Sequence, residues 1–371
     1  MTPRLVAARR SAVAPQGGAF RGLRIEDLAA PVLQAVLADA GLQPWDVDEL
    51  ICSNALGAGG NPARRIALAA GLPERVAGLS IDRQCAGGLD AIGLAVALVA
   101  AGQVRVVLAG GAESHSLRPL RAMADPFGGA ARAYDQAPFT PWPDRDPGMA
   151  EAAAALAARL GISRVEADEY AVESHARALA ADFSDEVVPL AGLQRDPFTR
   201  KLTPEVARRA KALPGQEGQV LTAANTAVAA DAAAFVLVVA DDIAQGRGLR
   251  VTGAATLGAD PTQPGLAPIP AIAQALVKAK LRPQDLHQAE VMEAYAVQAI
   301  ACLRGAGLDP TLVNLKGGAL ARGHPIGASG SILAVRLFHD LCRVTGPAKG
   351  PGLAAIASAG GIGAAMVFSA D

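Results

Sequence analysis

The sequence is poor in aromatic residues, has no excess of either charge and lacks the cysteine spacing of a metal site. Aromatic residues make up 4% of the 371 residues, and 34 Lys and Arg against 35 Asp and Glu give a net charge of −1. A near-neutral chain has no broad electrostatic attraction to nucleic acid or to an anionic membrane surface. We therefore expect neither as a partner, and any anionic ligand must be met by local groups.

The cysteines are few and scattered, and there is no C-x-x-C pair and no Cys/His pair at zinc-ligand spacing. We expect no metal and no disulfide framework. The uncharged apolar run 91–104 is also shorter than the roughly 18 residues of a membrane span. The first ten residues lack the apolar core of a signal peptide. These absences favour a reducing, cytoplasmic setting.

Small and aliphatic residues are abundant instead. Hydrophobic residues make up 51% of the chain and there are 40 glycines, a composition that suits helices packed closely on sheets. The runs 104–108 and 353–357 are continuous apolar strands of the kind that helices cover on both faces. The sequence therefore predicts an α/β protein of about two to three domains.

The segment 84–91 holds the first candidate for chemistry. It predicts a strand end, a tight turn and the start of a buried helix, with Cys85 at the turn. Backbone N–H groups at a helix N-terminus favour a thiolate and lower the pKa of the thiol. Cys85 is therefore a candidate nucleophile. The alternative is a small buried core residue, which is what most free cysteines are.

An internal repeat connects Cys85 with a histidine far along the chain. Two separate segments recur at one offset of 239 residues, which predicts a duplicated α/β unit, and the same offset pairs Cys85 with His324. If the halves pack about a pseudo-twofold axis, the thiol and the imidazole converge. The pairs that keep the offset are Pro31/Pro270, Leu37/Leu276, Leu42/Leu281, Pro44/Pro283, Asp46/Asp285 and Gly88/Gly327.

The elements around the repeat can be outlined as well. We expect a helix over 30–45 that opens at Pro31 and closes at Gly41, and a strand pair over 220–239. Between the halves, 119–219 is rich in proline and predicts an inserted lid with helices over 149–160 and 163–181. Its basic run includes Arg200 and Lys201 and is either a cradle for phosphate groups or a solvated surface loop.

Four segments together resemble the thiolase family (acetyl-CoA acetyltransferases and 3-ketoacyl-CoA thiolases). The family patterns are C-x-S-G, N-E-A-F-A, N-x-N-G-G-A-x-A-x-G-H-P-x-G-A-S-G and C-x-G-G-G. The matching segments are 84–88 (QCAGG), 291–296 (VMEAYA), 314–330 (NLKGGALARGHPIGASG) and 358–363 (SAGGIG). The resemblance implies that Cys85 takes an acyl group from an acyl-CoA and that His324 helps to activate the thiol. It also implies an oxyanion hole formed by the backbone N–H groups of Cys85 and Gly360.

The departures from the family patterns concern the second half of the reaction. The family's second cysteine, a base at the α-carbon, is matched by Ser358, whose hydroxyl is far too weak an acid to replace it unaided. The asparagine that anchors a catalytic water is matched by Met292, and a serine that meets the pantetheine by Ala227, so the resemblance implies that both positions contact the coenzyme A substrate. Glu293 is either a substitute base or a hydrogen-bonding residue behind the site, the role of the family's glutamate.

The resemblance implies the duplicated thiolase fold. This has two five-stranded mixed-sheet halves in an αβαβα arrangement, built from 1–118 with 220–247 and from 248–371, with 119–219 inserted. We expect an acyltransferase with an acyl-CoA substrate and no permanently bound cofactor, acting as a homodimer or tetramer. The alternatives are transfer to an acceptor other than coenzyme A and a non-catalytic partner subunit.

Overall fold

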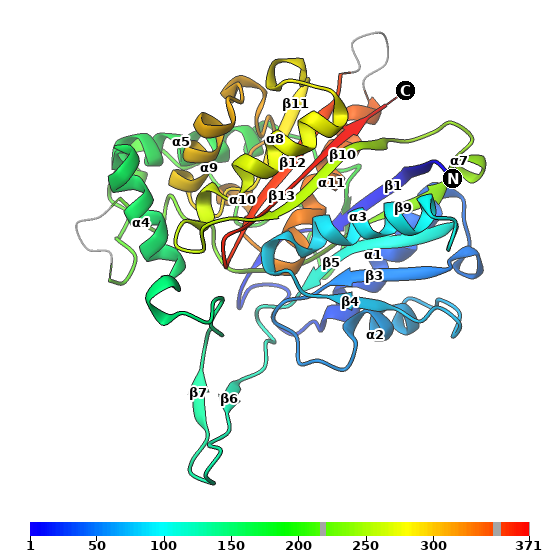
Figure 1. The fold of residues 1–371 in the computed structure, drawn as a ribbon, viewed down its shortest axis with the longest axis horizontal. Helices are drawn as coiled ribbons and strands as arrows, with labels where there is room; N and C mark the ends of the chain where they lie inside the picture. Colours follow the sequence, from blue (N-terminus) through cyan, green and yellow to red (C-terminus); the bar gives the residue numbers. More distant parts are fainter. Residues whose placement is uncertain (216–219, 344–349, 371) are drawn as a thin grey trace.

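The computed structural model describes residues 1–215, 220–343 and 350–370, so the predicted boundaries at 219 and 371 lie outside the described residues. Two β-sheets alternate with three layers of helices (Figure 1). The arrangement follows from the composition, because strands that are buried along their whole length must be covered on both faces.

The first sheet holds strands from both ends of the first 240 residues. Its order is β4-β3-β5-β9-β1-β8, and β2 pairs with β9. The strand β9 is antiparallel to both of its long neighbours, β5 and β1. The strands are β1 (Pro3–Ser11), β2 (Ala14–Pro15), β3 (Glu49–Ser53), β4 (Leu79–Ile81), β5 (Val106–Glu113), β8 (Val187–Val188) and β9 (Ala230–Ala240).

The second sheet repeats the plan of the first. Its order β11-β12-β13-β10 matches β3-β5-β9-β1, as the internal repeat predicts. The prediction of five strands in each half is wrong in detail, since the described residues give seven and four. The counterpart of β4 is reduced to a single bridge between Ala289 and Val313. The strands are β10 (Arg250–Gly258), β11 (Gln288–Val291), β12 (Gly352–Ser358) and β13 (Ile362–Ser369).

The helices form three layers around the sheets. α1 (Ile25–Ala40) and α2 (Pro62–Ala69) cover the outer face of the first sheet, where an apolar cluster joins them to it. α3 (Gly87–Ala100) and α11 (Ile326–Arg343) lie between the sheets. α8 (Pro268–Ala279) and α9 (Ala296–Ala306) cover the outer face of the second sheet. The predicted αβαβα fold is therefore confirmed.

The two central helices approach each other most closely at their N-termini, where glycines remove the side chains. A Cβ atom on Gly88 would lie 2.7 Å from the backbone nitrogen of Ser331 and 2.9 Å from the carbonyl oxygen of Gly327. A Cβ on Gly330 would lie 2.6 Å from the nitrogen of Leu89. Real Cβ atoms do not come so close, so this contact requires glycine. It fixes how the two halves meet.

Two local predictions fail. The first helix begins at Ile25 and not at Pro31, because the Asp27 carboxylate accepts a hydrogen bond from the Arg24 backbone N–H (3.0 Å) and starts the helix earlier. Pro31 lies inside it, and the helix ends at Gly41 as predicted, with φ of 69°. The expected strand pair over 220–239 is one long strand, β9, preceded by an irregular segment.

Within the described residues, the insertion holds a hairpin and three α-helices. The hairpin of β6 (Arg121–Met123) and β7 (Arg132–Tyr134) projects away from the body of the molecule (Figure 1). α4 (Met149–Leu160) and α5 (Arg164–Ala180) match their predicted ranges closely, and α6 (Pro204–Arg208) follows. The insertion is not wholly separate, because β8 pairs with β1. The remaining short helices are α7 (Asp241–Ala244) and α10 (Ala319–Arg322).

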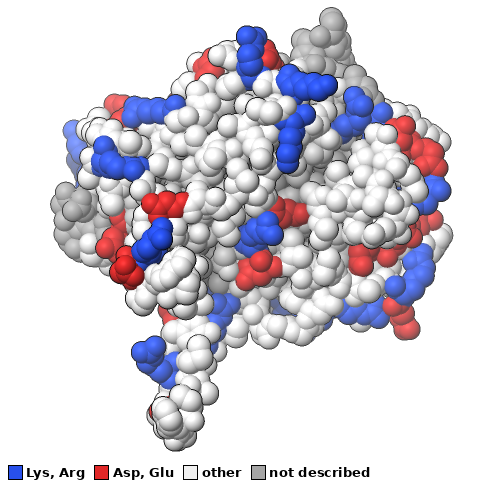
Figure 2. Space-filling view, viewed as in Figure 1, with Lys and Arg blue, Asp and Glu red and all other residues white. Residues whose placement is uncertain are grey.

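The surface and the helices agree with the composition. On the face that Figure 2 shows, basic and acidic side chains are interspersed and much of the surface carries neither. None of the helices in the described ranges combines the length and apolar character needed to cross a bilayer. In the same part of the chain, no group of three or more His, Cys, Asp and Glu side chains could hold a metal ion.

Candidate active site

Cys85 lies where the chain turns into α3. A short 3-10 turn, Gln84–Ala86, leads directly into the helix. Gln84 has φ of 48°, a conformation that costs a side-chain-bearing residue of order 1–3 kcal/mol. The Asp82 carboxylate holds it by accepting a hydrogen bond from the Gln84 N–H at 2.8 Å. The turn thereby places the Cys85 side chain at the open end of a helix.

The thiol meets the imidazole predicted to face it. Cys85 Sγ lies 3.1 Å from His324 Nε2. The other ring nitrogen, Nδ1, lies 2.6 Å from Ser329 Oγ, whose proton is donated to the Pro325 carbonyl at 2.9 Å. Because the serine proton is already used, His324 Nδ1–H is the donor in its contact with Ser329. Nε2 therefore carries the lone pair, and it accepts the thiol proton.

Burial keeps both partners neutral. It raises the pKa of Cys85 to about 12, although the backbone N–H groups of Cys85 and Ala359 act in the other direction. It lowers the pKa of His324 to about 4, with a further contribution from Arg322. The sequence argument for a lowered thiol pKa is thus wrong for the resting site, because desolvation outweighs the helix N-terminus. The resting pair is a thiol and a neutral base.

Glu113 fixes the start of the helix that follows His324. It is fully buried at the end of β5, and its Oε2 accepts hydrogen bonds from the N–H of Gly327 (2.9 Å) and of Ala55 (3.1 Å). Its Oε1 accepts from Asn54 Nδ2 and the Leu56 N–H. The carboxylate thus ties the first turn of α11, from the second half, to loop residues of the first half. This contact sets the position of His324 relative to Cys85.

The pair opens into a cavity of about 190 Å³. Among the described residues no charged side chain lines it, so the cavity suits a short uncharged group. One wall is apolar and comes largely from α4, and the other carries hydroxyl and amide groups. The lining includes Gln84, Gln136, Phe139, Met149, Ala152, Ala153, Leu156, Thr226, Ala227, Gln263, Pro264, Gly265, Ala294, Tyr295, Gln298, Ile326, Ala357, Ser358 and Ala359. We call this cavity the thiol pocket.

Ser358 and Ala227 line the thiol pocket, where the resemblance places them. The Ser358 hydroxyl donates a hydrogen bond to the Arg83 carbonyl oxygen at 3.1 Å. A hydroxyl that already donates to a backbone carbonyl is not set up as a base. Gly360 lies in the β12–β13 turn with φ of 74°. The neighbouring Ala359, not Gly360, lines the pocket, and its backbone N–H partly offsets the rise in the pKa of Cys85.

Met292 does not reach the thiol pocket. Its side chain is 1% exposed and packs in the apolar cluster between the two sheets. Its backbone N–H donates to the Ala355 carbonyl at 2.9 Å. In the structure, this residue packs the core at the end of β11, so the prediction of a contact with coenzyme A is wrong for its side chain.

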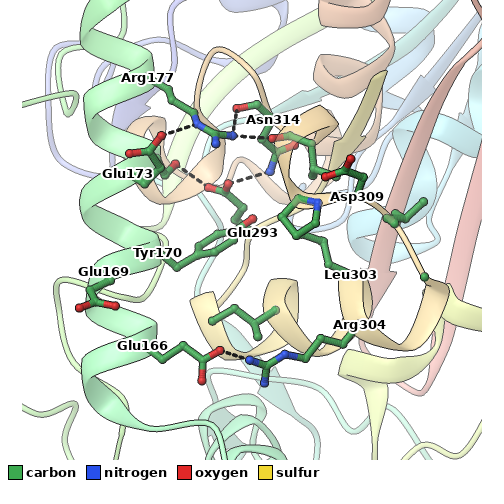
Figure 3. Close-up of a pocket in the computed structure, with 16 residues that line it drawn as sticks. Glu166, Glu169, Tyr170, Glu173, Arg177, Glu293, Leu303, Arg304, Asp309 and Asn314 are labelled. Atoms are coloured by element: carbon green, nitrogen blue, oxygen red, sulfur yellow. Dashed lines mark hydrogen bonds and ion pairs between the residues drawn. The ribbon is translucent and has the colours of Figure 1, made fainter. Parts of the chain in front are cut away.

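Glu293 faces away from the thiol pocket, so the prediction of a catalytic role as substitute base is wrong. Its carboxylate lies at the bottom of a larger cleft of about 730 Å³ between α5 and α9 (Figure 3). Oε1 accepts a hydrogen bond from Asn314 Nδ2 (2.7 Å), and Oε2 accepts from Ser174 Oγ (2.8 Å) and the Leu320 N–H (3.1 Å). A carboxylate with this many donors holds segments together, as the alternative interpretation predicts.

Arg200 and Lys201 lie outside the thiol pocket. The Arg200 guanidinium lies over the Phe198 ring, 4.2 Å from its centroid, and donates to the Phe198 carbonyl at 3.2 Å. Lys201 is exposed. Coenzyme A is long enough for its phosphates to lie away from the reacting thioester, so a phosphate contact at these residues stays a prediction.

Sequence reasoning missed the residues that support the pair. Ser329 belongs to the long glycine-rich motif and Glu113 to a buried strand. Neither sequence pattern shows that Ser329 contacts His324 or that Glu113 accepts from Gly327. A carboxylate at the end of an otherwise apolar strand was the available signal for Glu113. The polar wall formed by Thr226, Tyr295 and Gln298 was also missed, because their proximity depends on the pairing of two segments far apart in sequence.

Comparisons with known proteins agree along the whole chain. Family models described as the thiolase N-terminal and C-terminal domains match residues 4–242 and 248–370. YhfS of Bacillus subtilis is 39% identical over 98% of both chains, and an acetyl-CoA acetyltransferase of Cupriavidus necator is 38% identical, also over 98% of both. The solved human mitochondrial 3-ketoacyl-CoA thiolase in complex with CoA has a TM-score of 0.92 and 30% identity, covering 100% of this chain and 98% of its own.

Proposed function

The chain belongs to the thiolase family, and on that basis we propose that its reaction runs through a thioester on Cys85. It is an acyltransferase that uses an acyl-CoA substrate, of the type named acetyl-CoA acetyltransferase or 3-ketoacyl-CoA thiolase in its relatives. The observation that carries the proposal is the 3.1 Å contact between Cys85 Sγ and His324 Nε2 at the inner end of a small uncharged pocket.

The first half-reaction follows from the protonation states of the pair. His324 Nε2 takes the proton from Cys85 as the sulfur attacks the thioester carbon of the acyl-CoA, and a tetrahedral oxyanion forms. When the intermediate collapses, the carbon–sulfur bond to coenzyme A breaks, and the imidazolium returns the proton to the departing thiolate. The N–H groups of Cys85 and Gly360 donate to the oxyanion, a contribution of about 3–4 kcal/mol for each well-placed donor.

The test is the mass of the intact protein after mixing with acetyl-CoA and quenching in acid. We expect an increase by one acetyl group on the wild type, lost in Cys85→Ala and kept in the control Cys342→Ser, which removes an exposed thiol. No adduct on the wild type, or an adduct that persists in Cys85→Ala, would contradict the proposal.

The second half-reaction is where this chain differs from the family patterns. Ser358 takes the place of the family's second cysteine and donates to a carbonyl, and Met292 is buried in the core, so the described residues place no second thiol in the pocket. We infer that acylation of Cys85 is fast and that carbon–carbon bond making or breaking is slow. Loss of a general base costs about 10²–10⁴ in rate.

Thiolysis of acetoacetyl-CoA, followed by loss of the enolate absorbance, includes carbon–carbon cleavage as well as acetyl transfer from Cys85, so its comparison with acylation alone reports the carbon–carbon step. Slow thiolysis beside rapid acylation of Cys85 supports the inference. Acylation with no thiolysis would favour an acceptor other than coenzyme A, and the absence of both would favour a non-catalytic partner subunit. The names of the relatives support the thiolase reaction over these two alternatives.

Binding of the coenzyme A portion is proposed at the mouth of the thiol pocket. Ala227 lines the pocket beside the polar wall, and the basic residues Arg200 and Lys201 would meet the phosphates. The coenzyme is a substrate and leaves after each turnover. We propose a reducing compartment such as the cytoplasm, because a nucleophilic thiol must stay unoxidised between turnovers.

We further propose a homodimer or a tetramer. The short strand β4 lies at the edge of the first sheet, and its Leu79 is 40% exposed, which suits pairing between two copies along that edge. The projecting hairpin carries Phe127, which is 96% exposed, and Leu120 precedes it in full exposure. Exposed apolar side chains of this size favour contact with another subunit.

A further inference from the structure

One wall of the thiol pocket is formed by two segments that pair like strands. The Ala227 N–H donates to the Ala294 carbonyl at 3.0 Å, and the Ala296 N–H donates to the Asn225 carbonyl at 2.9 Å. These two bonds flank Thr226 and Tyr295, which face each other across an antiparallel bridge. In this kind of pair the residues make no backbone hydrogen bond to each other, and their side chains approach most closely.

Both side chains line the thiol pocket, and both have hydrogen-bonding capacity to spare. Thr226 Oγ1 is buried and has no hydrogen-bond partner in the described part of the chain. Burial raises the pKa of the Tyr295 phenol to about 12, with a further contribution from the nearby Cys85 sulfur. It is therefore protonated at neutral pH and acts as a donor.

Gln298 adds a third group to this wall. It is 3% exposed, and its Oε1 accepts a hydrogen bond from the Ala294 N–H at 3.1 Å. That contact fixes the amide and leaves Nε2 buried, again without a partner among the residues described. Buried donors are nearly always satisfied, so a pocket with two unpartnered polar atoms and a free phenol is built to receive a ligand.

We propose that Tyr295, with Thr226 and Gln298 beside it, binds the oxygen of the acyl acceptor during the second half-reaction. This inference rests on the proposed function. The ligand class is a carbonyl or enolate oxygen on a short, uncharged acyl unit, since hydroxyl and amide donors match an oxygen that gains negative charge. The small volume and the uncharged lining of the thiol pocket leave no place for a carboxylated chain.

Tyr295 carries a hydroxyl group that the family pattern lacks at this position. The family pattern N-E-A-F-A has phenylalanine there, and this chain has E-A-Y-A. The hydroxyl is the added group, in a chain whose Met292 offers only an inward-facing thioether where the pattern has an amide. Tyr295 therefore supplies a donor on the acceptor side of the pocket that the pattern does not provide.

The experiment compares Tyr295→Phe with the matched control Tyr134→Phe, which removes a phenol hydroxyl from the projecting hairpin. Two rates are measured: formation of acetyl-Cys85 by quenched mass spectrometry, and thiolysis of acetoacetyl-CoA. For Tyr295→Phe we expect kcat for thiolysis to fall about 10²-fold, as for loss of one oxyanion donor, with acylation slowed by no more than about threefold. Thr226→Val should lower thiolysis by about tenfold.

Comparison of the two rates shows whether Tyr295 donates to the acceptor oxygen or only supports the fold. Thiolysis by Tyr295→Phe at the wild-type rate, or an equal loss in both half-reactions, would overturn the inference. An absence of acetyl-Cys85 on the wild type would instead overturn the proposed function. If Tyr295→Phe were poorly folded, Thr226→Val would decide the matter, since the same split between the two rates is expected and equal losses would overturn the inference.

Discussion

The N-termini of α3 and α11 occupy equivalent places in the two halves, but their backbone N–H groups have different partners. Both helices start at the glycine contact between the sheets, and each follows one member of the reactive pair. The first turn of α3 has no side-chain cap, so its N–H groups stay available beside Cys85. In α11 the Gly327 N–H donates to Glu113. The duplication supplies the shared backbone position, and the differing side chains supply the thiol and the imidazole that we propose as nucleophile and base.

Replacing the base tests this division of roles most severely. In His324→Gln the thiol loses the acceptor of its proton, and its own pKa is far above neutrality, so little thiolate forms. We expect acylation of Cys85 to slow by about 10²–10⁴ at pH 7. Single-turnover acylation followed by mass measures this effect. His339→Gln, a change on α11 away from the thiol pocket, is the control and should acylate normally.

Separating the two helices should be the next largest effect. In Gly88→Ala the added Cβ would meet the Ser331 nitrogen, so α3 and α11 must move apart. We expect a loss of about 1–3 kcal/mol in the free energy of unfolding, and at least about tenfold slower acylation. Urea unfolding and the acylation assay measure the two effects.

A matched alanine on the same helix sharpens the comparison. A Cβ on Gly93 would meet only the Met366 Cε atom, at 3.4 Å. Gly93→Ala should therefore be neutral or stabilise the fold by up to about 1 kcal/mol, through the higher helix propensity of alanine. Equal destabilisation by both substitutions would show that the close contact at Gly88 has no special role.

Restoring a thiol on the acceptor side tests the other departure from the family patterns. In Ser358→Cys a group with a tunable pKa replaces a hydroxyl that donates to the Arg83 carbonyl. We expect thiolysis of acetoacetyl-CoA to rise by about tenfold or more, with acylation of Cys85 little changed. An unaltered thiolysis rate would mean that the second step is limited elsewhere.

The smallest effect should come from the residue that orients the base. Ser329→Ala removes the acceptor for His324 Nδ1–H and leaves both reacting atoms in place. Loss of one neutral hydrogen bond of this kind corresponds to about three- to tenfold in acylation rate. Ser329→Thr, which keeps a hydroxyl, should recover part of the rate, whereas a purely steric role would predict no recovery.

The sequence was sufficient to predict the fold and the contact between Cys85 and His324, because both depend on patterns that the chain repeats. The common offset placed Cys85 opposite His324, and the range predicted for α4 is the observed one. The protonation states could not be predicted in this way, since burial of Cys85 depends on packing from both halves. The role of Glu293 could not be predicted either, because the groups that donate hydrogen bonds to it, on Ser174 and Leu320, come from distant segments.

The strand count failed for a similar reason. β8 has only two residues, and it pairs with β1, which lies far away in the sequence. A local sequence pattern cannot predict such a pairing. The start of α1 was misplaced because proline is common in a first helical turn, whereas here the contact between Arg24 and Asp27 starts the helix earlier.

The pH dependence of the single-turnover acylation rate tests the central claim most directly. Because the pKa of His324 is lowered to about 4 and that of Cys85 raised to about 12, the competent neutral pair persists between those values. The wild-type rate should therefore be constant from about pH 6 to pH 9, while His324→Gln should rise about tenfold per pH unit as thiolate forms. A wild-type rate that climbs with pH as steeply as that of His324→Gln would contradict the claim that thiol and imidazole act as a pair.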